Sequence, residues 1–239
     1  VVAVVAGYRM VLGRLRGRVT VPVAPSGAFR AAELDRYARH IILREIGGAG
    51  QRKLNDAKVL VVGAGGLGAP VLLYLAGSGV GVIGVIDDDV VENTNLQRQV
   101  IHTDDRIGTA KVRSAEVAMR ALNPFIEVRP YTRRLTAEIA GDLVADYDLV
   151  IDGSDNFDTR YLVNEVCVAK GKPLISGAIT QWEGQLSLWH PGAGGPCYAC
   201  VFPNRPSPGM VPTCAEAGVA APLPGVIGAM MAMEAVKHL

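Results

Sequence analysis

Three closely spaced glycines are the first residues of this sequence whose pattern indicates a particular chemistry. Gly63, Gly65 and Gly68 form G-x-G-x-x-G between a short apolar segment and a longer apolar run. In such a turn the first glycine permits the tight bend, the second lets the backbone approach a phosphate, and the third lets the helix pack closely on the strand. The helix that follows offers free N–H groups to an anion. We therefore expect this loop, Gly66 included, to bind a nucleotide.

A carboxylate and two cations follow the glycine loop. Asp87 ends the next apolar segment, where a carboxylate can accept hydrogen bonds from a ribose hydroxyl. Arg98 and Lys111 can reach the phosphate region and neutralise charge that shifts during phosphoryl or nucleotidyl transfer. A dinucleotide-dependent dehydrogenase would share the glycines and Asp87 but would not need these cations. Surface salt bridges are the alternative interpretation of the charged residues.

Asp152 and Asp155 come at the end of a later apolar segment. If that segment is a strand of a parallel sheet, both residues lie at the edge where open α/β sheets bind ligands. Mg²⁺ prefers one or two carboxylates together with oxygens of the substrate. We therefore expect one of these carboxylates to hold Mg²⁺ against the phosphate oxygens.

The cysteines divide into a pair and two single residues. Cys197 and Cys200 have C-x-x-C spacing in a loop rich in Gly and Pro, which is typical of half a tetrahedral Zn²⁺ site. Cys214 precedes a predicted helix, whose N-terminus can lower the pKa of a thiol, so it is either a reactive thiol or a plain loop cysteine. Cys167 falls in a helical pattern and is expected to be a small core residue.

These residues need elements that bring them to one edge of the molecule. Five apolar segments alternate with helical patterns, which predicts βαβ units and a parallel sheet, and a sixth segment alternates polar and apolar residues. The sequence therefore predicts an α/β fold: a Rossmann-like, mostly parallel sheet with helices on both faces and an antiparallel C-terminal extension. The predicted strands are 58–62, 82–86, 126–131, 148–152, 173–176 and 185–189, and the predicted helices are 31–46, 67–78, 109–122, 136–144 and 157–169.

Composition agrees with this fold and excludes other classes. Of 239 residues, 49% are hydrophobic and 20% charged, which excludes disorder for most of the chain, and the 5% of aromatic residues argues against a β-sandwich. The net charge of +1 does not indicate nucleic acid as a partner. Residues 1–30 contain five arginines and no acidic residue, so we expect a basic flexible tail there, with one domain over 31–239.

Neither apolar stretch of the sequence resembles a membrane span. Residues 1–6 are too few and lack the basic flank of a signal peptide, and residues 217–236 are interrupted by Pro222, Pro224 and Glu234. The latter stretch predicts a loop and a buried helix. Without an export signal we expect a cytoplasmic protein that contacts no membrane, where cysteines serve as metal ligands or reactive thiols more often than as disulfides.

The ordered motifs together resemble the ThiF/MoeB/HesA (ubiquitin-activating-like) superfamily, and within it most closely the MoeB/MoeZ molybdopterin-synthase adenylyltransferases. The resemblance covers about residues 34–239. It is carried by Arg36-Tyr-Ala-Arg39, Val62–Gly68, Asp87, Asn95-Leu-Gln-Arg-Gln99, Gly108 with Lys111, Asp152–Asn156 with Arg160, Ser176-Gly-Ala178, Cys197-Tyr-Ala-Cys200 and Thr213–Gly218.

The resemblance implies an ATP-dependent adenylyltransferase. Its substrate would be a ubiquitin-like sulfur carrier protein with a Gly-Gly C-terminus, and the likeness to MoeB/MoeZ points to the carrier of molybdopterin synthase. The acyl-adenylate would accept sulfur from a sulfurtransferase or rhodanese-like donor to become a thiocarboxylate. Alternatives are a carrier of the thiamine or cysteine pathway, a tRNA-linked carboxylate, a non-catalytic carrier-binding subunit and, from another class, an NAD(P)-dependent oxidoreductase.

The resemblance also implies roles for individual residues. Arg39 would be an arginine finger supplied by the second subunit of a homodimer, and Cys214 a covalent acceptor. The family carries a second C-x-x-C near its C-terminus, which this sequence lacks, so we expect that the C-terminal end is missing and that a structural Zn²⁺ site is incomplete here. The ATP-binding set would be Gly63, Gly65, Gly66, Gly68, Asp87, Asn95, Arg98, Gln99, Lys111 and Asp155, with Asp155 as the residue that holds Mg²⁺.

Overall fold

The computed structural model describes residues 29–207, 210 and 214–239. The expected basic tail therefore lies almost wholly outside the described residues. The chain divides into two compact units, Val1–Ala38 and Arg39–Leu239. In the described part of the first unit, the Phe29 ring packs edge-on against Tyr37 with 6.1 Å between ring centroids. Helix α2 (Ala31–Ile42) begins there, and its first turn is fixed by the Glu33 carboxylate, which accepts from the Arg30 N–H at 2.9 Å.

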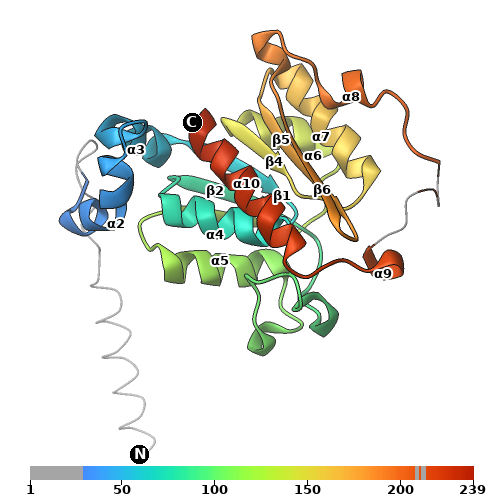
Figure 1. Ribbon diagram of the computed structural model, residues 1–239, viewed down its shortest axis with the longest axis horizontal. Helices are drawn as coiled ribbons and strands as arrows, with labels where there is room; N and C mark the ends of the chain where they lie inside the picture. Colours follow the sequence, from blue (N-terminus) through green and yellow to red (C-terminus); the bar gives the residue numbers. More distant parts are fainter. Residues whose placement is uncertain (1–28, 208–209, 211–213) are drawn as a thin grey trace, which may run out of the picture. The chain divides into compact units, whose positions relative to one another are not determined.

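The second unit is built on a six-stranded sheet of order β3-β2-β1-β4-β5-β6 (Figure 1). All neighbouring strands are parallel except β5 and β6, which form an antiparallel hairpin. This pairing confirms the predicted mostly parallel sheet with its antiparallel C-terminal end. The strands are β1 (Lys58–Val62), β2 (Val82–Ile86), β3 (Glu127–Tyr131), β4 (Leu149–Asp152), β5 (Leu174–Thr180) and β6 (Glu183–Trp189).

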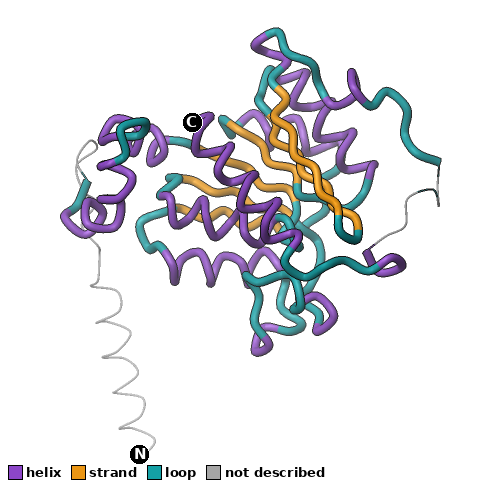
Figure 2. Tube along the Cα trace, viewed as in Figure 1, coloured by secondary structure: helices purple, strands orange, loops and turns teal. Residues whose placement is uncertain are grey.

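Helices cover both faces of the sheet because the strands are apolar on both sides. Alternate residues of β1 belong to two separate cores: Val59 and Val61 to one, Leu60 and Val62 to the other. The first core is closed by α4 (Gly68–Ser78), α5 (Lys111–Leu122) and α10 (Leu223–His238), and the second by α6 (Ala137–Ala145) and α7 (Phe157–Lys170). Figure 2 shows the two helical layers with the orange strands between them.

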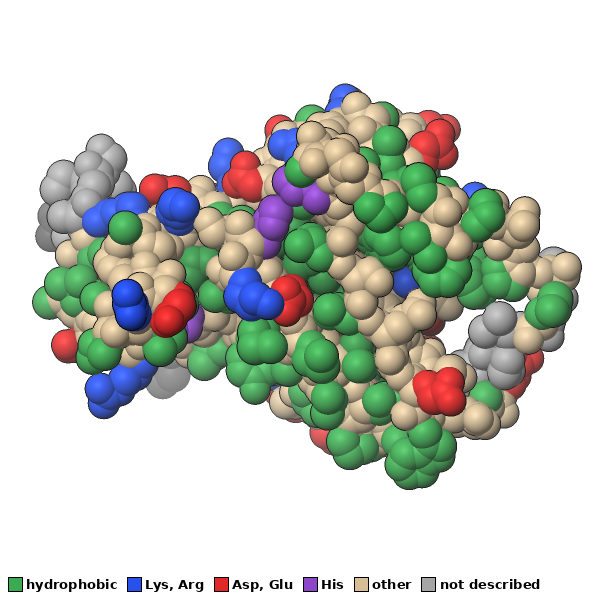
Figure 3. Space-filling view, turned by 45° about the horizontal axis from the view of Figure 1, so that its top comes forward, with side chains coloured by type: hydrophobic (Ala, Val, Ile, Leu, Met, Phe, Trp, Pro, Cys, Tyr) green, Lys and Arg blue, Asp and Glu red, His purple; other side chains and the backbone are tan. Residues whose placement is uncertain are grey.

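The outer surface of α4 and α10 keeps several large hydrophobic side chains in solvent. Tyr74, Val226, Met230 and Met233 are all exposed. The space-filling view shows hydrophobic side chains spread over one side of the molecule (Figure 3). No helix in the described ranges is long and apolar enough to cross a membrane.

One prediction about the helices was wrong. The sequence predicted a single helix that ends before Gly47, but α2 ends at Ile42 and a new helix, α3 (Gly47–Asp56), begins at that glycine. Gly47 has a φ of +61°, so it turns the chain and lets a second helix start at once. Four short elements were also not predicted: η1 (Asn93–Asn95), η2 (Asp104–Arg106), η3 (Pro191–Ala193) and α8 (Tyr198–Val201). The helix expected after Cys214 begins at that residue, as α9 (Cys214–Ala217).

Candidate active site

A cavity of about 570 Å³ lies at the carboxyl ends of β1, β2 and β4. This volume falls in the range of small-molecule sites, and the position is the one where open α/β sheets bind ligands. The strand order places β1 at the centre, so the loops after its two neighbours face each other across the glycine loop. The predicted site residues that line the cavity are Gly63, Gly65, Gly66, Asp87, Arg98, Gln99, Lys111 and Asp155.

The carboxylate of Asp87 is tied to the glycine loop. Its Oδ2 accepts from the Ala64 N–H at 2.7 Å and its Oδ1 from the Asp89 N–H at 2.8 Å. Burial raises the pKa of Asp87, although these two backbone hydrogen bonds act in the opposite direction. Gly63 has a φ of +94°, as the tight turn requires. Asp87 therefore stands at the cavity with its orientation fixed by the loop.

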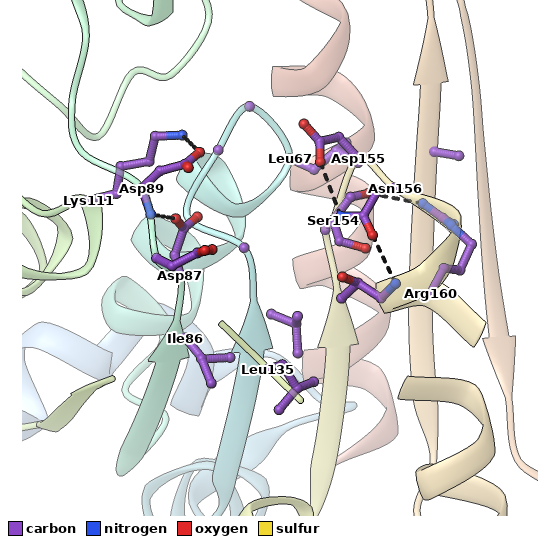
Figure 4. Close-up of a pocket in the computed structure, with 18 of the residues that line it drawn as sticks. Leu67, Ile86, Asp87, Asp89, Lys111, Leu135, Ser154, Asp155, Asn156 and Arg160 are labelled. Carbon is purple, nitrogen blue, oxygen red and sulfur yellow. Dashed lines mark hydrogen bonds and ion pairs between the residues drawn. The ribbon is translucent and has the colours of Figure 1, made fainter. Parts of the chain in front are cut away.

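Lys111 holds its charge close to the same point. Its Nζ lies 2.7 Å from Asp89 Oδ2, with the lysine side chain 7% exposed and the aspartate side chain 66% exposed. The lysine is the first residue of α5, whose start is fixed by the hydrogen bond from its N–H to the Asp89 carbonyl. Figure 4 shows this pair on one side of the glycine loop. Arg98, half-buried on the cavity wall, donates through Nη1 to the Thr94 carbonyl at 3.1 Å.

The loop after β4 forms the opposite wall. Asp152 is fully buried, and its Oδ1 accepts from the N–H and the Oγ–H of Ser154 at 2.9 and 2.6 Å. Arg160 donates to the carbonyls of Ser154 and Gly177, and its Nε lies 3.9 Å from Asp152 Oδ2. Burial raises the pKa of Asp152. Asp155 is exposed beside them and directly precedes Asn156, the N-cap residue of α7 (Figure 4).

Three members of the predicted set lie off the cavity wall. Gly68 begins α4 directly behind the loop, where a Cβ would collide with the Gly63 carbonyl oxygen. Asn95 ends η1, and its carbonyl accepts from the N–H groups of Arg98 and Gln99, so it shapes the turn that carries them. Arg39 is exposed on α2 and is not among the residues that line the cavity.

Several lining residues were not predicted. Arg133 and Arg134 lie in the loop after β3 and reach the same cavity. Their position directly after a predicted strand was the available signal, because carboxyl ends of parallel strands share one edge. Asp88 and Asp89 also line the cavity, and with Asp87 they form a group of carboxylates within 4.8 Å of one another.

The cysteine pair is geometrically suited to a metal. Cys197 Sγ and Cys200 Sγ are 3.5 Å apart, near the separation that two thiolates take on one tetrahedral Zn²⁺. Burial opposes ionisation of Cys197, but hydrogen bonds from Asn164 and Cys200 outweigh it and lower the pKa of this thiol. Cys167 is buried, which raises its pKa to about 12 and fits the predicted core role. Cys214 is the first residue of α9, and its side chain lies outside the described residues.

Comparisons with known proteins identify a matching family model, related sequences and similar solved structures. The ThiF family model matches residues 37–239. The SAMP-activating enzyme E1 of Haloferax volcanii is 53% identical over 209 residues, which cover 87% of this chain and 77% of that protein. The sulfur carrier protein adenylyltransferase of Thermus thermophilus is 53% identical over 211 residues, which cover 87% of this chain and 78% of that protein. The crystal structure of E. coli MccB with ATP has a TM-score of 0.69 and 28% identity, covering 79% of this chain and 57% of MccB.

Proposed function

Because this chain belongs to the ThiF family, we propose that it adenylates the C-terminal glycine carboxylate of a ubiquitin-like sulfur carrier protein at the expense of ATP. The observation that carries the proposal is the convergence of Asp87, Arg98, Lys111 and Asp155 on one cavity beside the glycine loop. The two relatives at 53% identity, one of them a sulfur carrier protein adenylyltransferase, support the same reaction.

The proposed step joins two anions, which explains the need for cations. An oxygen of the carrier's carboxylate attacks the α-phosphorus of ATP. The bond from that phosphorus to the bridging oxygen of pyrophosphate breaks, and pyrophosphate leaves with the electron pair. No proton moves. Arg98 and Lys111 would neutralise the charge that collects on the phosphates, and Lys111 is already desolvated against Asp89.

The remaining residues of the cavity would bind and orient the nucleotide. The Asp87 carboxylate would accept from the ribose hydroxyls. Gln99 would make a polar contact with the nucleotide, because its Oε1 is buried with no hydrogen-bond partner among the described residues. Asp155 would hold Mg²⁺, which when bound would supply further charge neutralisation on the phosphates. Its exposed carboxylate, on the wall opposite Lys111, fits that assignment.

Three further parts of the proposal concern the assembly. Arg39 would act at the cavity of a second copy in a homodimer, which agrees with its absence from the wall of its own cavity. Cys197 and Cys200 would supply two of the four ligands of a structural Zn²⁺, and their sulfur separation suits such a pair. The Cys214 thiolate would accept the acyl group of the activated carrier, and AMP would leave. A sulfurtransferase or rhodanese-like partner would deliver the sulfur. These steps would take place in the cytoplasm, where ATP is supplied.

The identity of the carrier is tested by ATP–pyrophosphate exchange with purified Gly-Gly-ended carriers. We expect exchange with the molybdopterin-synthase carrier and not with carriers of the thiamine or cysteine pathways. Exchange with another carrier alone would move the assignment to that pathway. Absence of exchange with every carrier would contradict the proposed reaction.

Two cavity variants and one control test the proposed roles. Lys111→Ala and Asp155→Ala should each lower the exchange rate about 100-fold or more, because the first removes a cation at the phosphates and the second removes the proposed Mg²⁺ ligand. Arg113→Ala is the matched control from the same helix as Lys111: Arg113 is exposed and pairs only with Glu116 at 3.0 Å among the interactions described. It should keep the wild-type rate. Undiminished exchange in both cavity variants would remove the mechanism.

A further inference from the structure

His102 lies behind the glycine loop and contacts it through one backbone carbonyl. Its Nε2 is 2.9 Å from the Ala64 carbonyl oxygen, and its Nδ1 is 2.9 Å from Ser114 Oγ. The residue is 5% exposed and is not part of the cavity wall. Because a carbonyl oxygen can only accept, Nε2 carries the hydrogen. Nδ1 of the neutral ring then accepts from the Ser114 hydroxyl.

The protein fixes this tautomer from the other side of the ring. Arg106 donates through Nη1 to the Ser114 carbonyl at 2.6 Å and to Ser114 Oγ at 3.3 Å. The hydroxyl that receives this hydrogen bond is left with its own hydrogen to give to His102. Burial, with the nearby charges of Lys111 and Arg106, lowers the pKa of His102 and keeps the ring neutral.

The residue that His102 contacts stands inside the phosphate-binding turn. Ala64 lies between Gly63 and Gly65, and its N–H is the group that donates to Asp87 Oδ2. The two peptides that flank Ala64 are therefore held separately, one by Asp87 and one by His102. In a planar trans peptide the N–H points opposite to the C=O. The N–H of Gly65 consequently points away from the buried imidazole, on the side where Gly65 lines the cavity.

We propose that His102 is a positioning residue for the nucleotide: by holding the Ala64 carbonyl it orients the Gly65 N–H toward the phosphates. The inference rests on the proposed function, because it assigns a phosphate donor within that ATP site. The inference goes beyond the proposed function because it assigns the orientation of a loop N–H group to a residue that lies outside the cavity.

The test compares ATP affinity, by calorimetry, in three variants. His102→Leu keeps the bulk and removes both hydrogen bonds, and we expect ATP to bind about tenfold more weakly. His102→Gln restores an N–H donor at the end of the side chain, and we expect affinity within about threefold of wild type. In exchange assays the KM for ATP should rise in His102→Leu by a larger factor than kcat falls.

Asn123→Ala is the matched control. Asn123 is fully buried and, like His102, donates to a backbone carbonyl, that of Ala76 at 2.7 Å, at the far end of the helix that follows the glycine loop. Its loss should lower the melting temperature and leave ATP affinity unchanged. Amide hydrogen exchange of Ala64 and Gly65 without ATP gives a second readout, and it should accelerate in His102→Leu and not in Asn123→Ala.

The possible results separate the two claims. If wild type binds no ATP, the proposed function and this inference both fail. If wild type binds ATP and His102→Leu binds it equally well, the inference fails while the proposed function stands. If Asn123→Ala weakens ATP binding as much as His102→Leu does, the effect is one of general stability and the inference is again overturned.

Discussion

Burial makes the ionised form of the Asp152 side chain unfavourable. Its Oδ1 accepts two hydrogen bonds from Ser154, but its Oδ2 has no hydrogen-bond partner among the described residues and faces Arg160 at 3.9 Å. Burial raises its pKa above the ordinary value of 3.8. A carboxyl group with a raised pKa in the folded state contributes stability at low pH that is lost as the pH rises through that pKa.

Replacing Asp152 with Asn should remove this pH dependence. The amide keeps an acceptor for the Ser154 donors and cannot ionise. We expect the free energy of unfolding of Asp152→Asn to increase relative to that of wild type as the pH rises above about 4. Urea unfolding of both proteins between pH 4 and 8 measures the difference. Parallel pH profiles would show that the carboxyl does not titrate in this range.

Residue type and spacing predicted part of the cavity wall, chiefly residues that directly follow a strand or start a helix. Gly63 and Asp87 directly follow β1 and β2, and Lys111 starts α5. His102 gave no such signal, since its contact with Ala64 depends on how a long irregular segment folds back behind the loop. Packing of that kind is set by tertiary structure and leaves no local pattern.

At the scale of elements, the agreement is best where the chain is apolar and buried. The predicted bounds of β1 and β2 match the structure residue for residue, because both strands are buried runs ended by glycine or charge. Strand β5 extends to Thr180, beyond the predicted end at Ser176. Its extra residues pair with β6, and the sequence did not reveal that long-range hydrogen bonding.

The junction between the glycine loop and α4 makes a prediction about one glycine. A Cβ on Gly68 would collide with the Gly63 carbonyl oxygen, so Gly68→Ala must displace the loop or the helix. We expect a loss of about 1–3 kcal/mol in the free energy of unfolding. ATP binding should be lost as well. Thermal unfolding and calorimetry measure the two effects.

Gly225→Ala provides the matched control for that change. Gly225 is also helical, but a Cβ there meets nothing within 4 Å. The substitution should raise stability by up to about 1 kcal/mol through helix propensity and leave ATP binding intact. Wild-type stability and binding in Gly68→Ala would contradict the assigned close approach.

At the scale of the whole molecule, the proposed homodimer predicts complementation between two inactive proteins. Arg39→Ala lacks the proposed finger, and Lys111→Ala lacks a cation of the cavity. If the finger acts across subunits, a mixed dimer has one site with both defects and one intact site. Mixing equal amounts after subunit exchange should restore about a quarter of the wild-type sites by random pairing. Pyrophosphate exchange of the mixture measures this recovery.

The outcome without a dimer is distinct. If Arg39 acts within its own chain, both sites of a mixed dimer stay defective. If Arg39 has no catalytic role, each variant keeps in the mixture the activity that it has alone. The mixture would then show no more than the average of the two proteins measured alone. Mixing Lys111→Ala with Asp155→Ala is the control, because both defects lie in the same cavity and cannot complement.

The central place of β1 has a consequence for how the chain matures during synthesis. β1 pairs with β2, which follows soon after it, and with β4, which is made much later; Lys58 N–H donates to Asp148 Oδ2 across 90 positions of sequence. A nascent chain that has released only β1 to β3 already carries the glycine loop but lacks the opposite wall. A nucleotide that contacts both walls binds the finished sheet more tightly than a shorter one, so its binding energy would favour the complete fold.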